Sequence, residues 1–68
     1  METKDIRVVI IEDDETIRNG FEYLINASKG YQVVKTFPDV EKAFTGMPDP
    51  APDVILLDIE LPGTKGID

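Results

Sequence analysis

The hydrophobic residues form three short continuous runs, separated by two stretches in which they recur every three or four positions. The first run, residues 5–11, includes an unbroken β-branched series at 8–11. Such a series is typical of a strand buried on both faces of a parallel sheet. Residues 31–37 and 54–57 are also rich in strand-forming side chains. The pattern therefore predicts three strands, with the third also buried on both faces.

The first of the two periodic stretches predicts an amphipathic helix. Asp14 stands where an N-cap is expected, and Lys29 with Gly30 supplies a stop signal. The apolar positions fall on one helical face: Ile17, Phe21, Leu24 and Ile25.

The second periodic stretch predicts a shorter helix opened by Pro38 and Asp39. Residues 46–52 contain three prolines and must form a connector, because proline cannot continue a helix. The apolar positions of the short helix share one face: Val40, Ala43, Phe44 and Met47.

Strands that alternate with helices run parallel, and the expected architecture is an open α/β sheet with helices on both faces. Sites in such sheets lie at the carboxyl ends of the strands. Glu12 and Asp13 directly follow the first predicted strand, and Asp58 ends the third. If these strands are neighbours, the three carboxylates converge.

Composition narrows the possible chemistry. The 68 residues suffice for one small domain, and fourteen acidic against seven basic residues give a net charge of −7, which argues against direct nucleic-acid binding. The chain contains no cysteine and no histidine. No segment has the length of a membrane span, and we expect no membrane contact and a cytoplasmic location.

Three carboxylates held close together repel one another, and a divalent cation relieves that repulsion. A site made only of oxygen ligands suits Mg²⁺ or Mn²⁺. Such a metal supports phosphoryl transfer, in which a carboxylate can itself be the nucleophile. An acid after a strand can also simply cap a helix. We favour capping for Asp14, and chemistry for Glu12, Asp13 and Asp58 together.

Two segments resemble the receiver domains of response regulators. Residues 9–14 (VIIEDD) look like the strand and acidic pair that open a receiver, and residues 53–63 (DVILLDIELPG) look like its phosphoacceptor segment. The resemblance implies a flavodoxin-like (CheY-like) fold with strand order beginning 2-1-3. It also implies that Asp58 accepts a phosphoryl group from a sensor histidine kinase.

The resemblance further implies a Mg²⁺ ion bound by Asp13, Asp58 and the main-chain carbonyl of Glu60, with Glu12 in the outer coordination shell. Gly66 matches the glycine that closes the loop after the phosphoacceptor. Lys65 departs from the pattern, because an acid or amide is common there. A basic residue at that position would alter metal affinity.

The resemblance covers about half of a receiver, and residues 1–68 are expected to be the N-terminal part of a single such domain. The hydroxyl residue and the lysine that read out phosphorylation in the family lie outside this stretch. Taken alone, we expect residues 1–68 to fold poorly or to form a homodimer through the third strand and the first helix. The first helix and the turn after it look similar to receivers that control transcription.

Two other functions remain open from the sequence. Residues 12–16 (EDDET) roughly match the nucleophile motif of haloacid-dehalogenase-type phosphatases, although a glutamate replaces the nucleophilic aspartate. A receiver-like interaction module that takes no phosphate is the second alternative. Nucleotide binding is disfavoured, because neither phosphate-loop motif occurs.

Overall fold

The computed structural model describes residues 5–58, which form three strands and two helices in alternation. Their bounds follow the predicted periodicity closely: β1 Ile6–Glu12, α1 Glu15–Ala27, β2 Tyr31–Phe37, α2 Val40–Gly46 and β3 Val54–Asp58. Three residues named in the sequence predictions lie outside the described residues: Glu60, Lys65 and Gly66.

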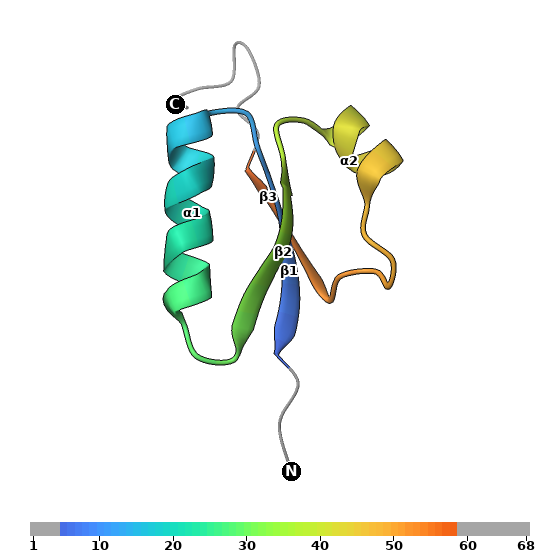
Figure 1. Ribbon diagram of the computed structural model, residues 1–68. Helices are drawn as coiled ribbons and strands as arrows, with labels where there is room; N and C mark the ends of the chain where they lie inside the picture. Colours follow the sequence, from blue (N-terminus) through green and yellow to red (C-terminus); the bar gives the residue numbers. More distant parts are fainter. Residues whose placement is uncertain (1–4, 59–68) are drawn as a thin grey trace, which may run out of the picture.

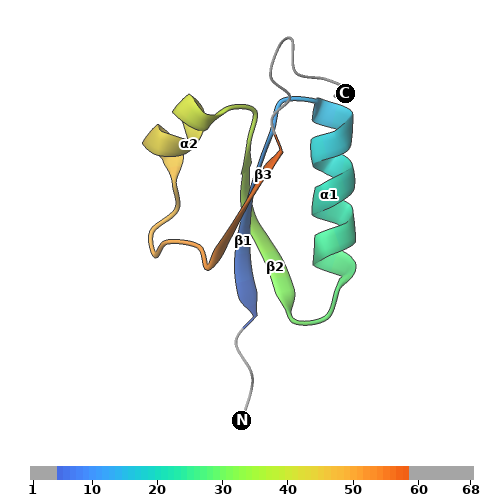
Figure 2. The same ribbon diagram turned by 180° about the vertical axis from the view of Figure 1, so that it is seen from behind.

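The three strands form one parallel sheet in the order β2-β1-β3. Figures 1 and 2 show α1 on one face of this sheet and α2 on the other. The predicted order 2-1-3 and the helices on both faces are confirmed. The three strands and two helices thus have the arrangement of a flavodoxin-like fold.

The centre of the structure is β1, which has a neighbour on each side. Val9 and Ile10 are completely buried, on opposite faces of the strand. On the α2 face, a hydrophobic core forms around Val9, with Ile11, Phe37 and Ala43. The β-branched series therefore is a buried central strand, as the sequence predicted.

The connection from α1 to β2 depends on a glycine. Gly30 has a φ of 91°, a left-handed conformation that side chains with a Cβ rarely adopt. Its carbonyl accepts a hydrogen bond from the Ile6 N–H at 2.8 Å. Gly30 thus lies in the turn that follows α1 and joins the start of β1 to that turn.

The apolar face predicted for α1 is only partly covered. Phe21 and Ile25 are half-buried, whereas Ile17 is 46% and Leu24 62% exposed. The helix packs on β1 and β2, and among the described residues an open hollow remains between Ile25 and β3. The described part of the sheet therefore covers the apolar face of α1 only in part.

One burial prediction is wrong, and one apolar residue of α2 lies outside the core. Phe44 was expected to share one helical face with Val40, Ala43 and Met47, but it is 79% exposed, whereas Val40 and Met47 pack on the core that contains Ala43 and Phe37. The third strand was expected to be buried on both faces. Val54, Ile55 and Leu57 are about half exposed, because β3 is an edge strand of the described sheet.

Among residues 5–58, no helix is long and apolar enough to cross a membrane.

Candidate functional site

The carboxyl ends of β1 and β3 lie beside each other at the end of the sheet where α1 begins (Figure 1). The two strands pair in register from Val8 with Val54 to Glu12 with Asp58. Asp13 follows β1 directly. The sheet therefore brings Glu12 and Asp58 from opposite ends of the sequence to adjacent positions.

Glu12 belongs to β1 rather than following it, and it is only 4% exposed. One of its carboxylate oxygens, Oε2, accepts a hydrogen bond from the main-chain N–H of Asp14 at 2.9 Å. Asp13 and Asp58 are exposed to solvent. The site thus consists of one buried, anchored carboxylate beside two accessible ones.

The environment of Glu12 has opposing effects on its pKa. The hydrogen bond from the Asp14 N–H lowers the pKa, because it favours the ionised form. Burial raises the pKa, as do hydrogen bonding with the side chains of Asp13 and Asp58 and the charge of Asp58. The net effect is a pKa of Glu12 above the ordinary value for glutamate.

Asp14 has a different role. Its side-chain Oδ1 accepts the N–H of Ile17 at 3.0 Å, and its backbone is extended, as in an N-cap. The capping interpretation of Asp14 is therefore confirmed, and this carboxylate is engaged with the helix.

Removing the cap should lower stability with little effect on the chemistry. We expect Asp14→Ala to reduce the free energy of unfolding by about 1 kcal/mol, because the first turn of α1 loses an acceptor for an N–H group. Urea unfolding of the full-length protein, followed by circular dichroism, measures this. Asp14→Ser retains a capping oxygen and should stay within about 0.5 kcal/mol of the wild type; equal losses for serine and alanine would contradict the capping role.

Arg18 is a site residue that the sequence analysis missed. Its Nη1 donates a hydrogen bond to the main-chain carbonyl oxygen of Glu12 at 2.8 Å. The half-buried guanidinium therefore fixes the last peptide of β1 and places a positive charge beside the acidic group. A basic residue one turn into a helix that follows an acidic strand end is the signal that could have found it.

A metal site is not formed by the described residues alone. Among residues 5–58, no group of three or more acidic or histidine side chains has the arrangement of a metal-binding set. The carboxylates of Asp13 and Asp58 are accessible oxygen donors, the type that Mg²⁺ prefers. The other predicted ligand, the Glu60 carbonyl, lies outside the described residues.

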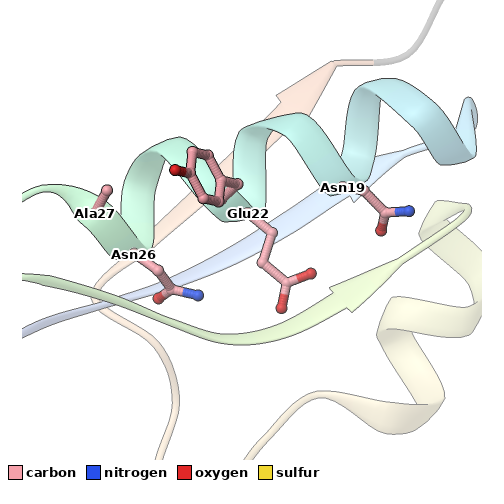
Figure 3. Close-up of a pocket in the computed structure, with 5 residues that line it drawn as sticks. Asn19, Glu22, Asn26 and Ala27 are labelled. Atoms are coloured by element: carbon pink, nitrogen blue, oxygen red, sulfur yellow. The ribbon is translucent and has the colours of Figure 1, made fainter.

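A hollow along α1 has a single carboxylate among its lining residues, that of Glu22. Figure 3 shows Asn19, Glu22 and Asn26 projecting from the helix on the side of β2. The side-chain oxygen of Asn26 accepts the Val33 N–H at 2.8 Å. Asn26 thus attaches α1 to β2, and the candidate site stays at the strand ends.

The family model of the response regulator receiver domain matches residues 8–68. The chain belongs to this family of signalling domains. No solved structure matches the chain at a significant level.

Among curated proteins, the chain is 41% identical over 66 residues to protein-glutamate methylesterase/protein-glutamine glutaminase 4 of Anaeromyxobacter dehalogenans, covering 97% of this chain and 18% of the relative. It is 39% identical over 61 residues to protein-glutamate methylesterase/protein-glutamine glutaminase 1 of Cereibacter sphaeroides. This match covers 90% of this chain and 16% of the relative. It is 32% identical over 63 residues to the sensory transduction protein LytT of Bacillus subtilis. This match covers 93% of this chain and 26% of the relative. The chain therefore spans about a quarter or less of these relatives.

Proposed function

We propose that this chain accepts a phosphoryl group on Asp58 from a sensor histidine kinase in the cytoplasm. The observation that carries the proposal is the register of β1 and β3, which places the exposed Asp58 directly beside the buried Glu12. A nucleophile has to be reached by its phosphoryl donor, and Asp58 meets this condition where Glu12 does not. The family to which the chain belongs supports the same assignment.

The transfer requires one new bond and one broken bond. A carboxylate oxygen of Asp58 attacks the phosphorus of a phosphohistidine, and an O–P bond forms as the N–P bond breaks. The electron pair of the broken bond stays on the imidazole nitrogen, which takes up a proton. The product is an acyl phosphate at Asp58, which water later hydrolyses to the carboxylate and inorganic phosphate.

The other residues prepare the site for the incoming charge. Glu12 is held by the Asp14 N–H, and the Glu12 carbonyl is held by Arg18, so the end of β1 is fixed before the donor arrives. Asp13 and Asp58 would hold Mg²⁺, or Mn²⁺, with the Glu60 carbonyl, and Glu12 would stand in the outer shell. When bound, the cation neutralises charge on the transferring phosphoryl group.

The structure also bears on the phosphatase alternative. In that motif Glu12 would stand at the nucleophile and Asp14 at the second aspartate. Glu12 is buried and hydrogen-bonded, and Asp14 caps α1. Neither carboxylate is placed for those roles, and we therefore favour the receiver over the phosphatase.

Stoichiometric self-phosphorylation tests the proposal. We expect the full-length protein, treated with acetyl phosphate and Mg²⁺, to gain one phosphoryl group per molecule, because one accessible carboxylate is the acceptor. Intact-protein mass spectrometry measures the gain, and p-nitrophenyl phosphate serves as a control substrate. Many turnovers of that ester by the purified protein would support the phosphatase; no labelling would support a receiver-like module that takes no phosphate.

The output controlled by phosphorylation is a separate question. The resemblance to transcriptional receivers rests on α1 and its turn, whereas two of the relatives above are named protein-glutamate methylesterases. We propose an enzymatic output of that type for the full-length protein in place of transcription. Release of methanol from methylated glutamate by the full-length protein would support it, and specific binding to DNA would support transcription.

A further inference from the structure

The strand that holds Asp58 is anchored at its opposite end by a pair of residues outside the site. The N–H of Arg7 donates to the Asp53 side-chain Oδ2 at 2.9 Å, and the N–H of Asp53 donates to the Arg7 carbonyl at 2.9 Å. The Arg7 guanidinium also donates to the carbonyl oxygen of Ala51. These three hydrogen bonds, here called the Arg7–Asp53 clamp, join the start of β3 to the start of β1.

The clamp matters because, within residues 5–58, side-chain packing determines the register of β3 only weakly. Val54 is 46%, Ile55 49% and Leu57 58% exposed, so a change of partner costs β3 less buried surface than it would cost β1. If β3 slid by two residues along β1, Leu56 would pair with Glu12 in place of Asp58. Each side chain of β3 would still point to the same face of the sheet, because side chains alternate every two residues. The same slide would carry Asp58 about 6.6 Å beyond Glu12, at about 3.3 Å per residue.

The residues before the clamp cannot fix the register in its place. Pro50 and Pro52 have no N–H, so neither can donate to β1. The connector between α2 and β3 is seven residues long, 47–53, and a change of a residue or two in its span costs little loop entropy. Among the described connector residues, Asp53 is the one whose side chain accepts a hydrogen bond from β1.

We infer that Asp53 is a positioning residue for phosphorylation: through Arg7 it sets the register of β3, and thereby places Asp58 beside Glu12. This inference rests on the proposed function. Asp53 directly precedes β3, which begins at the end of the sheet opposite the acidic site (Figure 2), so Asp53 acts on the reaction only through the strand. An acceptor oxygen at the correct distance is what the role requires, and the negative charge is not.

This requirement gives three informative variants of the full-length protein. Asp53→Ala removes the acceptor, Asp53→Glu keeps the charge but moves the oxygens by a methylene group, and Asp53→Asn keeps an acceptor oxygen in place. We expect alanine and glutamate to slow the labelling of Asp58 by acetyl phosphate and Mg²⁺ about 5- to 10-fold, since small misplacements of a nucleophile are costly. Asparagine should stay within about twofold of the wild type, because the acceptor persists.

Two controls separate positioning from general loss of stability. Val40→Ala weakens the core on the α2 side, far from the clamp, and should label at the wild-type rate at temperatures where it is folded. Nuclear Overhauser effects between β1 and β3 report the register directly: they should connect Glu12 with Asp58 in the wild type and in Asp53→Asn, and weaken in the glutamate variant. The glutamate variant keeps the test decisive if alanine does not fold.

Labelling of Asp53→Ala and Asp53→Glu at the wild-type rate would overturn the inference, as would an asparagine variant as slow as alanine. Either result leaves the proposed function intact, because the wild type is still labelled at Asp58. If the wild type itself takes no phosphoryl group, the proposed function fails, and the cross-strand contacts alone then decide whether the clamp sets the register.

Discussion

Replacing Asp58 by asparagine in the full-length protein should reduce phosphoryl labelling by at least about 100-fold, because a neutral amide is a far weaker nucleophile than a carboxylate. The replacement keeps the shape of the side chain, and Asp58 is exposed at the end of an edge strand. The fold should therefore be unchanged. Labelling with acetyl phosphate and Mg²⁺, followed by mass spectrometric location of the adduct, measures the effect.

The matched control is Asp49→Asn, the same chemical change at an exposed acid in the connector before β3. This variant should be labelled like the wild type. The predicted role of Asp58 as the sole acceptor would be wrong if labelling of Asp58→Asn remained at the wild-type level. A residual adduct found on Asp13 would show instead that the neighbouring carboxylate can substitute when Asp58 is lost.

Replacing Asp13 by alanine should weaken Mg²⁺ binding by at least about 10-fold. A hard cation bound through so few carboxylates loses a large share of its favourable charge when one of them is removed. Glu12 cannot easily compensate, because it is buried and its carboxylate already accepts the Asp14 N–H. Titration calorimetry with Mg²⁺ on the full-length protein compares the two affinities.

Net charge has to be separated from ligation in that experiment. Asp49→Ala also removes one negative charge, but from an exposed position in the connector, and it should bind Mg²⁺ as the wild type does. Mn²⁺ offers an independent measurement, because its binding can be followed by electron paramagnetic resonance. Equal affinities of Asp13→Ala and the wild type would mean that the carboxylates at the strand ends do not form the metal site.

The sequence by itself determined the elements and their order. Hydrophobic periodicity distinguishes a strand from a helix because side chains repeat every two residues in one and every 3.6 in the other. The predicted range 31–37 coincides with β2, and the predicted cap Asp14 does cap α1. Parallel topology followed from the alternation of strands with helices, since each crossover returns the chain to the same end of the sheet.

The acidic end of the sheet was also predictable, because each of the three carboxylates stands at the end of an apolar run. The strand order, which the resemblance supplied, then decided that two of them would be neighbours. Periodicity alone leaves this order open: it shows that a strand is buried, and not which strand lies beside it. The pairing of Glu12 with Asp58 is thus a property of the sheet.

Burial was the property that only the tertiary structure decided. An apolar residue is buried only if another element covers it, and in the described chain nothing covers much of β3, Leu24 or Phe44. Conversely, Glu12 is buried although it is charged, because the Asp14 N–H offers it a hydrogen bond at the strand end. The contact of Asp53 with Arg7 likewise joins residues that no local pattern connects. Such contacts depend on where the strands and helices meet in space. The hydrophobic pattern of the sequence does not specify those positions.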